Sequence, residues 1–122
     1  MTDESTPDLD QLSGEALVRV LAALANPHRV RILAVLHARR VHVSQLAREV
    51  GLSRPLVHMH LRKLEDAGLV SGQLELSREG KAMKYFEVTH FTLRLTPALI
   101  AEAARTLGPA AGSTLDTKEN ER

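Results

Sequence analysis

The sequence predicts a mostly helical domain with one β-hairpin, an α+β fold, and three observations support this prediction. Apolar residues recur at helical spacing in four successive segments between residues 13 and 68. Alternation of apolar and polar residues replaces that spacing in two short runs, at residues 74–76 and 86–88, which predicts two strands joined by a turn. A last helical pattern follows in residues 97–107. We therefore expect helices on both sides of a hairpin.

Length and composition limit the classes of protein. The 122 residues suffice for one domain with a modest core. The chain contains no cysteine, which excludes disulfides and thiolate nucleophiles. No run of 18 apolar residues could span a bilayer, and the acidic, polar beginning differs from the basic start of a secretory signal. We therefore expect a cytoplasmic protein without a membrane partner, and no catalytic motif indicates an enzyme.

Composition predicts three parts of the chain. Residues 1–12 are rich in Asp, Ser, Thr and Pro and form an expected disordered acidic tail. Residues 13–108 form the expected folded domain, and residues 109–122 a flexible C-terminal tail. The net charge of +1 hides an uneven distribution, since residues 16–107 contain 14 basic and 7 acidic residues. A basic domain with acidic or mixed ends suits a polyanionic partner.

Two capping signals place the first two helices. Ser13 is expected to cap a helix that ends near Ala25. Asn26 and Pro27 end that helix and begin the next, because Asn caps helices and Pro suits the first helical position. This second helix is expected to reach about Ala38. The apolar face of the first helix consists of Leu17, Val20, Leu21 and Leu24.

The next segment predicts two short helices joined by a tight turn. Ser44 is expected to cap the first of them, and Gly51 ends it because glycine takes the left-handed conformation without steric cost. Ser53 caps the second helix, with Pro55 in its first turn, and Gly68 ends it. The second helix has a buried stripe of Val57, Leu61 and Leu64 and an outward face of Arg54, His58, Met59, Arg62 and Lys63.

A helix-turn-helix places such a polar, basic second helix in the major groove of DNA. The candidate DNA contacts are Ser44, Gln45, Ser53, Arg54, Leu56, His58, Met59, Arg62 and Lys63. Arginine can bind guanine with two hydrogen bonds, lysine suits a phosphate, and hydroxyls at helix N-termini can meet phosphates. The alternatives are a solvated charged face or a helical hairpin inside another bundle. His60 faces the body of the domain, and we interpret it as a hydrogen-bonded structural residue.

The alternating segment predicts the wing of a winged helix-turn-helix domain. Leu74 and Leu76 alternate with polar residues, as do Phe86 and Val88, and the polar loop SREGKAM lies between the two runs. Such a hairpin usually lies along the phosphate backbone or the minor groove beside the second helix. The basic residues expected at its tip are Arg78, Lys81 and Lys84.

The last part of the domain returns from strand to helix. Residues 91–95 continue the apolar alternation and predict a further short strand. Thr96 and Pro97 are expected to begin a helix, by the same cap and first-turn preferences as above, and this helix reaches about Leu107. The small domain then has two terminal helices whose apolar faces must be covered. Pairing of two copies of the chain across a two-fold axis would cover them.

Three segments resemble the ArsR-type family of small bacterial repressors: LANPHRVRIL at residues 24–33, SQLAREVGLSRPLV at 44–57 and HLRKLEDAGLV at 60–70. The resemblance implies a transcriptional regulator, repressor or activator, that binds a palindromic operator as a homodimer. Its first and last helices then form the dimer interface. The implied interface residues are Leu17, Leu21, Leu24, Leu99, Ile100, Ala103 and Leu107.

The metal-sensing pattern of this family is only partly present. Members that sense arsenic, cadmium or lead use cysteines where this chain has His42 and Ser44. Zinc and nickel sensors carry a His/Glu pair on the last helix, where this chain has only Glu102. The chain resembles a cysteine-free branch with a link to nickel, so nickel or zinc is a candidate effector. The candidate ligands are His37, His42, Glu87, His90 and Glu102.

Two classes of function compete for this chain. The leading hypothesis is a sequence-specific DNA-binding regulator, and the alternative is a winged-helix protein-interaction module. A regulator gated by a partner protein, and so with a protein co-regulator, is a further alternative to gating by metal. An interaction module should expose apolar or acidic residues on the second helix, whereas this chain exposes two Arg and a Lys. Double-stranded DNA is therefore the expected partner.

Overall fold

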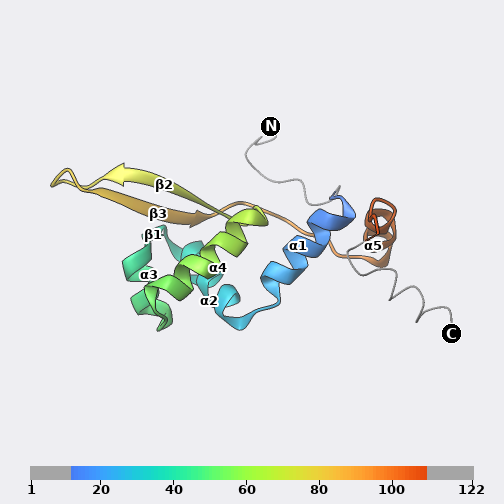
Figure 1. Ribbon diagram of the computed structural model, residues 1–122, viewed down its shortest axis with the longest axis horizontal. Helices are drawn as coiled ribbons and strands as arrows, with labels where there is room; N and C mark the ends of the chain where they lie inside the picture. The colour runs from blue at the N-terminus through green and yellow to red at the C-terminus, as the bar shows by residue number, and fades with distance from the viewer. Residues whose placement is uncertain (1–11, 110–122) are drawn as a thin grey trace.

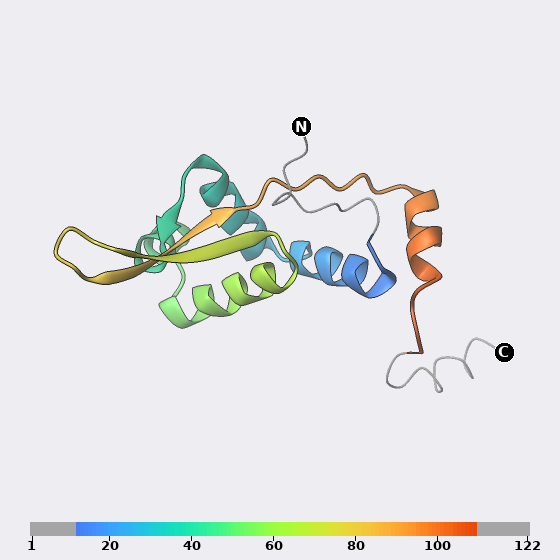
Figure 2. The same ribbon diagram turned by 90° about the horizontal axis from the view of Figure 1, so that it is seen from above.

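The computed structural model describes residues 12–109, which form five helices and a three-stranded antiparallel sheet (Figures 1 and 2). In chain order the elements are α1 (Gly14–Leu24), α2 (Pro27–Ala38), β1 (Val41–His42), α3 (Val43–Val50), α4 (Arg54–Asp66), β2 (Val70–Leu76), β3 (Ala82–Val88) and α5 (Pro97–Ala104). This order confirms the winged helix-turn-helix fold. The expected tails lie almost entirely outside the described residues, so the predicted domain limits stay a prediction.

The caps of α1 and α2 agree with the sequence. The Ser13 hydroxyl accepts the backbone N–H of Ala16 at 3.1 Å. The Asn26 side-chain oxygen accepts the N–H groups of His28 and Arg29 at 2.8 and 3.3 Å, with Pro27 as the first helical residue. Both caps use residues two or three positions away in the chain, which is why local chemistry was sufficient to predict them.

The predicted cap of α3 is wrong. His42, not Ser44, is the N-cap, and its Nδ1 accepts the backbone N–H of Gln45 at 3.3 Å. Ser44 lies inside the first turn of the helix. The cap moved because Val41 and His42 pair with β3, which holds His42 in an extended conformation immediately before the helix. A serine is the better cap in isolation, but pairing with a strand far along the chain decided the helix start.

The turn between α3 and α4 follows the prediction. Gly51 ends α3 at a φ of 70°, in the left-handed region that favours glycine. Ser53 then caps α4 by accepting the Leu56 N–H at 3.3 Å, and Pro55 lies in the first turn. These two signals, two positions apart, set the tight turn that places α4 against α3.

The hairpin is confirmed, with a shorter tip than the sequence predicted. β2 pairs with β3 from Val70 opposite Val88 to Leu76 opposite Ala82, which leaves residues 77–81 as the connecting turn. Gly80 has a φ of 80° in that turn. The sequence predicted Lys84 at the tip, and this prediction is wrong. Lys84 lies in β3 opposite Leu74. Leu74 and Leu76 project beyond the core and are 72% and 75% exposed.

β1 and the segment after β3 differ from the sequence expectation. β1, which the sequence did not predict, pairs with β3 through Val41 opposite Phe86. The further strand expected at residues 91–95 does not form, and only an isolated bridge occurs at Thr92. The physical reason is that β2 begins at Val70, so no partner strand remains for the chain beyond Thr89, whose N–H bonds to the Leu69 carbonyl at 3.0 Å.

The core lies between α1, α2, α3, α4 and the sheet. Its most deeply buried side chains are Val20, Ile32, Leu46, Val57, Leu61, Leu64 and Leu69. The predicted inner stripe of α4 is thus confirmed, and Val70 and Phe86 close the core from the sheet. Figure 1 shows the hairpin at one end of this core and α5 at the other. No helix within residues 12–109 combines the length and apolarity needed to cross a membrane.

α5 starts at the predicted cap, Thr96, and ends at Ala104 instead of Leu107. The last turn tightens, because the N–H groups of residues 105–107 bond to carbonyls three positions back. The Thr106 hydroxyl then accepts the Gly14 N–H at 2.7 Å and joins the two terminal helices. A Cβ on Gly14 would lie 2.4 Å from Leu107 Cγ and 2.5 Å from the Ala103 oxygen. Only glycine permits this close approach of α1 and α5.

Candidate nucleic-acid interface

The outward face of α4 is exposed as the sequence predicted. Arg54, His58, Arg62 and Lys63 are all exposed, and the two apolar candidates, Leu56 and Met59, are 44% and 46% exposed. The opposite face is anchored in the core, so the helix cannot turn to bury these side chains. α4 therefore presents a fixed polar surface.

A basic groove runs between α4 and the wing. One hollow of about 370 Å³ is lined on its α4 side by residues that include His58, Met59 and Arg62 and on its strand side by Lys84 and Phe86. Lys84 Nζ lies 5.3 Å from the centroid of the Phe86 ring, so the ammonium is held beside the groove. The short turn of the hairpin thus leaves Lys84 in β3 beside α4, which we call the recognition helix.

A second hollow of about 260 Å³ continues the groove towards α3. It shares His58 and Lys84 with the first and adds Ser44, Arg54 and Lys81. The structure therefore brings together predicted residues from three separate elements: the start of α3, the α4 helix and the wing. We call these two adjoining hollows the basic groove. Arg78 is exposed in the turn of the wing next to it.

Arg48 is a candidate contact that the sequence reasoning missed. It is exposed on α3 and lines a shallow hollow with Ser44, Ser53 and Arg54 at the helix-turn-helix bend. Its position on the polar side of a strongly amphipathic helix was the available signal, because the apolar stripe of α3 already identified the opposite side.

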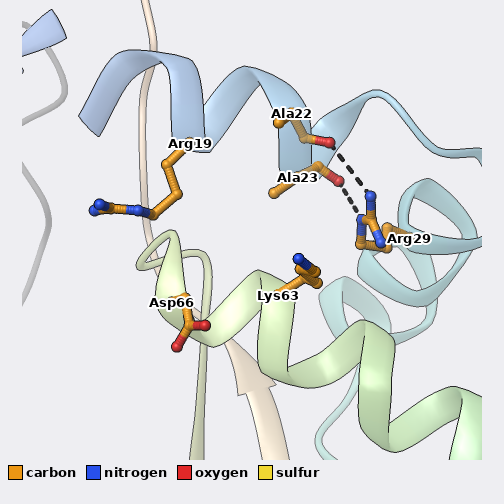
Figure 3. A pocket seen from close by; sticks show the side chains of 6 residues that line it. All are labelled: Arg19, Ala22, Ala23, Arg29, Lys63 and Asp66. Atoms are coloured by element: carbon orange, nitrogen blue, oxygen red, sulfur yellow. Dashed lines mark hydrogen bonds between the residues drawn. The ribbon is translucent and has the colours of Figure 1, made fainter. Parts of the chain in front are cut away.

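Lys63 lies apart from the basic groove. It lines another hollow, between α1, α2 and α4, together with Arg19, Arg29 and Asp66 (Figure 3). Helical spacing alone placed Lys63 on the same outward face as Arg62, but the two side chains project towards opposite flanks of α4. The structure therefore separates Lys63 from the other predicted DNA contacts.

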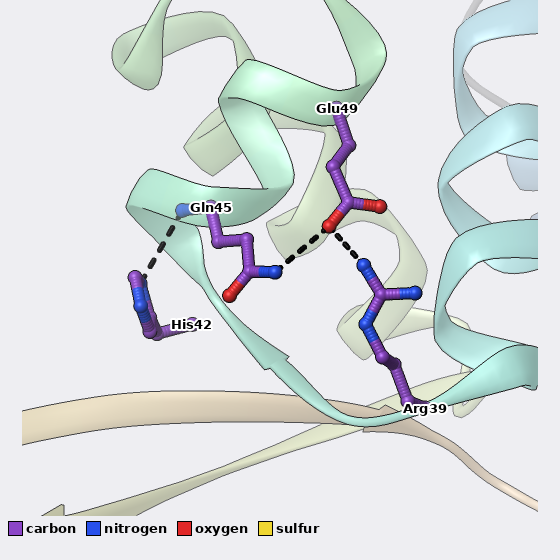
Figure 4. Close-up of polar contacts among 4 residues, drawn as sticks. All are labelled: Arg39, His42, Gln45 and Glu49. Atoms are coloured by element: carbon purple, nitrogen blue, oxygen red, sulfur yellow. Dashed lines mark hydrogen bonds and ion pairs between the residues drawn. The ribbon is translucent and has the colours of Figure 1, made fainter.

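Gln45 is held within the protein at the start of α3 (Figure 4). Its side-chain amide donates to Glu49 Oε2 at 3.0 Å, and Arg39 forms an ion pair with the same carboxylate. Because the Arg39 guanidinium donates to it, the pKa of Glu49 lies below its ordinary value. This bond uses one of the two N–H donors of the Gln45 amide, so the second can still donate to a phosphate.

The wing is fixed by contacts on the other side of the sheet. The Arg40 guanidinium pairs with Glu75 and lies 4.7 Å from the centroid of the Tyr85 ring. The hydrogen bond to Glu75 raises the pKa of Arg40 above its ordinary value. The His42 ring stands edge-on to the Tyr85 ring, with 5.7 Å between the two ring centroids. These contacts tie the α2–β1 connection to the hairpin and so orient the wing.

His60 is a hydrogen-bonded structural residue, as the sequence predicted. It is 4% exposed, and its Nδ1 lies 3.1 Å from Nη1 of Arg29. A guanidinium only donates, so Nδ1 must accept and the imidazole is neutral. Burial, the Arg29 charge and the neighbouring His28 ring at 5.6 Å all act to lower the pKa of His60. The contact fastens the recognition helix to α2.

The candidate metal ligands do not converge. Within the described residues, no group of three or more His, Cys, Asp or Glu side chains is close enough to hold a metal ion. The His42 side chain already caps α3. Oε1 of Glu102, on α5, lies 3.6 Å from Nη1 of Arg105. Two of the candidate ligands, His37 and His90, line one hollow between α2 and the segment after β3.

The terminal helices leave an apolar surface exposed. Of the implied interface residues, Leu17 and Ala103 are buried within the chain, whereas Ile100 and Leu107 are 48% and 47% exposed. Leu21, Leu24 and Leu99 are half-buried. The large exposed apolar side chains on this side are Val18, Leu95, Ile100 and Leu107. Val18 and Leu95 were absent from the sequence expectation, since their exposure depends on how α5 covers α1.

The family model described as "Bacterial regulatory protein, arsR family" matches residues 26–71, from the cap of α2 to the start of β2. The uncharacterized HTH-type transcriptional regulator MJ0229 of Methanocaldococcus jannaschii is 39% identical over 84 residues, which cover 69% of this chain and 87% of that protein. Both descriptions are those of transcriptional regulators.

Two solved structures show the same fold. NolR from Sinorhizobium fredii has a TM-score of 0.53 and 27% identity, with 75% of this chain and 80% of that chain covered. Mb0332 from Mycobacterium bovis, described as a homodimeric winged helix-turn-helix DNA-binding domain, has a TM-score of 0.56 and 20% identity, with 88% and 85% covered. The likeness to Mb0332 is one of fold.

Proposed function

The chain belongs to the arsR family of bacterial regulatory proteins, and on that premise we propose that it binds a palindromic operator as a homodimer. It is accordingly a DNA-binding transcriptional regulator. The observation that most supports the proposal is the basic groove, in which α4 and the wing form two walls around a polar hollow.

The charge of the groove suits a nucleic acid. Its lining includes the cations Arg54, Arg62, Lys81 and Lys84, with Glu65 as the single acidic residue among the side chains that line it. Arg54 and Arg62 lie on α4, which enters the major groove in this fold, so we assign them to bases or to adjacent phosphates. Lys81, with Arg78 beside it in the turn of the wing, is assigned to the phosphate backbone.

The homodimer is proposed from the apolar surface of α1 and α5. Four large side chains there are about half exposed, and a monomer would leave them in water. A two-fold axis through this surface would cover them and present two copies of α4 on one side. Two such helices read half-sites about one or two helical turns apart, roughly 34–36 Å per turn.

A second candidate function is the response of the regulator to nickel or zinc as its effector. The observation that favours it is the common hollow of His37 and His90, because imidazole is a good ligand for both metals. Two imidazoles leave further positions to water or to a partner chain. A gel shift on the operator with and without each metal, for the unaltered chain and for His37→Ala, tests this candidate.

Footprinting on an operator selected from random DNA, combined with light scattering, tests the main proposal. We expect two symmetric protected half-sites, a dimer of the 13.4 kDa chain at micromolar concentration, and binding that weakens steeply with salt. Each neutralised phosphate should add about 0.9 to the log–log slope. A single asymmetric site bound by a monomer would overturn the proposal, as would binding that does not respond to salt.

A further inference from the structure

A hollow separate from the basic groove lies on the opposite flank of the recognition helix. It encloses about 230 Å³ between α1, α2 and α4, and its lining shares no residue with the groove. Figure 3 shows the side chains of Arg19, Ala22, Ala23, Arg29, Lys63 and Asp66 around it. The hollow thus touches a terminal helix and the recognition helix at once.

The hollow has an excess of positive charge. Three cations and one carboxylate line it. The ion pairs found within residues 12–109 join Arg39 with Glu49, Arg40 with Glu75 and Arg105 with Glu102, so none of them neutralises these four groups. Arg19 and Lys63 are exposed and remain able to donate to a ligand.

Arg29 forms a fixed wall of the hollow. Its Nε donates to the Ala23 carbonyl at 2.7 Å and its Nη2 to the Ala22 carbonyl at 3.3 Å, while Nη1 contacts His60. Its position is therefore set by the end of α1 and by the core, with no ligand needed. Its charge remains next to the hollow without the entropy cost of ordering a free side chain.

We propose that this hollow binds a small phosphate monoester that carries a free hydroxyl group. The phosphate would accept from Lys63 and Arg19, since ammonium and guanidinium groups are the usual phosphate donors in proteins. The volume equals about eight water molecules, room for a phosphate and a few carbon atoms. Asp66, which also lines the hollow, would repel a second anionic group and accept from a hydroxyl.

The placement links such a ligand to DNA binding. Lys63 belongs to the recognition helix, and Arg19 to α1, whose other side is the apolar surface of the proposed dimer. A phosphate that bridges them would restrain α4 relative to α1. Any preference of the ligand for one arrangement then changes the affinity for DNA, and DNA changes the affinity for the ligand by the same factor.

Titration of the full chain in the absence of DNA tests the site, with glycerol 3-phosphate as the probe at constant ionic strength. We expect one saturable site per chain by calorimetry, and tighter binding of glycerol 3-phosphate than of inorganic phosphate. Arg19→Gln and Lys63→Gln should each weaken binding about tenfold or more. The matched control is Arg31→Gln, which removes the same charge from an exposed position of α2 outside the hollow.

Three results would overturn the proposal. The first is the lack of a saturable site, and the second is an equal loss in Arg31→Gln, which would indicate general charge attraction. The third concerns a DNA backbone phosphate, which has the same chemistry as the ligand. If Arg19→Gln and Lys63→Gln lowered the salt dependence of DNA binding while the unaltered chain bound no free ligand, the hollow would be a DNA contact.

Unchanged melting curves confirm that the variants fold. In the unaltered chain, saturating ligand should change operator affinity, and an unchanged affinity would contradict the link to α4.

Discussion

The groove at one end of this molecule and the apolar surface at the other differ in their chemistry. The α4 and wing end exposes arginine, lysine and histidine around a groove, whereas the α1 and α5 end exposes valine, leucine and isoleucine. Both surfaces remain after the same core is filled. The comparison teaches that the two surfaces suit different contacts. The basic groove suits an anionic partner, and the apolar surface suits another apolar surface that covers it.

The two ends also differ in how firmly they are held. α4 is anchored by Val57, Leu61 and Leu64, all of them almost completely buried, and by the contact of His60 with Arg29. α5 has one buried residue, Ala103, and its hydrogen bond to the rest of the fold runs through Thr106. The recognition helix is thus anchored in the core of the chain, while α5 is attached mainly at Ala103 and Thr106.

The largest expected effect comes from a charge on the apolar end. Ile100→Asp should abolish the dimer at micromolar concentration, because burial of an isoleucine side chain contributes about 1.5–3 kcal/mol and a two-fold interface contains it twice. The dimer dissociation constant should rise by roughly two to four orders of magnitude. Light scattering measures it. Leu74→Asp is the matched control, since that leucine is 72% exposed on the wing, and a dimer lost equally in both variants would contradict the assignment of the two ends.

Gly14→Ala tests the contact between α1 and α5. A Cβ at this position would meet a backbone oxygen, so α5 must move, at a cost of about 1–3 kcal/mol in the free energy of unfolding. Thermal melting followed by circular dichroism should show a midpoint lower by several degrees. Gly108→Ala is the control, because a Cβ there meets no atom within 4 Å and should leave the midpoint in place. Equal midpoints for both variants would show that α5 does not rest on α1 in solution.

Within the basic groove, Arg54→Ala and Lys81→Ala should behave differently. Arg54→Ala should cost about 1–3 kcal/mol on the preferred operator and relax its discrimination against random DNA. Lys81→Ala should weaken binding to all sequences alike and reduce the salt slope by about one. A guanidinium can match a pattern of acceptors, whereas an ammonium in a turn senses charge. Gel shifts over a salt series measure both. If the ratio of specific to random binding stayed unchanged in Arg54→Ala, α4 would not be the reading element.

The smallest effect concerns the anchor of the recognition helix. The pKa of His60 is lowered in the fold, so the unfolded chain binds a proton more readily there, and the free energy of unfolding should fall as the pH drops below about 6.5. His60→Asn keeps an acceptor for Arg29 but cannot titrate, so its stability should depend less on pH in that range. Urea denaturation at several pH values measures this. His58→Asn, an exposed position on the same helix, should retain the pH dependence, and an identical profile in all three proteins would remove His60 as the cause.

Local chemistry was enough to predict most of the helices and the exposed face of α4. Ser13, Asn26, Ser53 and Thr96 all cap the helices that the sequence assigned to them. A cap involves residues two or three positions apart, and an apolar stripe involves one helix, so both can be read without knowledge of the fold. The inner and outer faces of α4 followed for the same reason.

Contacts between distant parts of the chain decided the rest. The strand β1 and the cap at His42 depend on pairing with β3, and the place of Lys84 depends on the register of the hairpin. Lys63 was assigned to the outward face by its spacing, but only the position of α1 shows that it lies on the other flank of the helix. The sequence determined which side chains point outward from α4, and tertiary packing determined which of them meet, because neighbours across a groove are set by other elements.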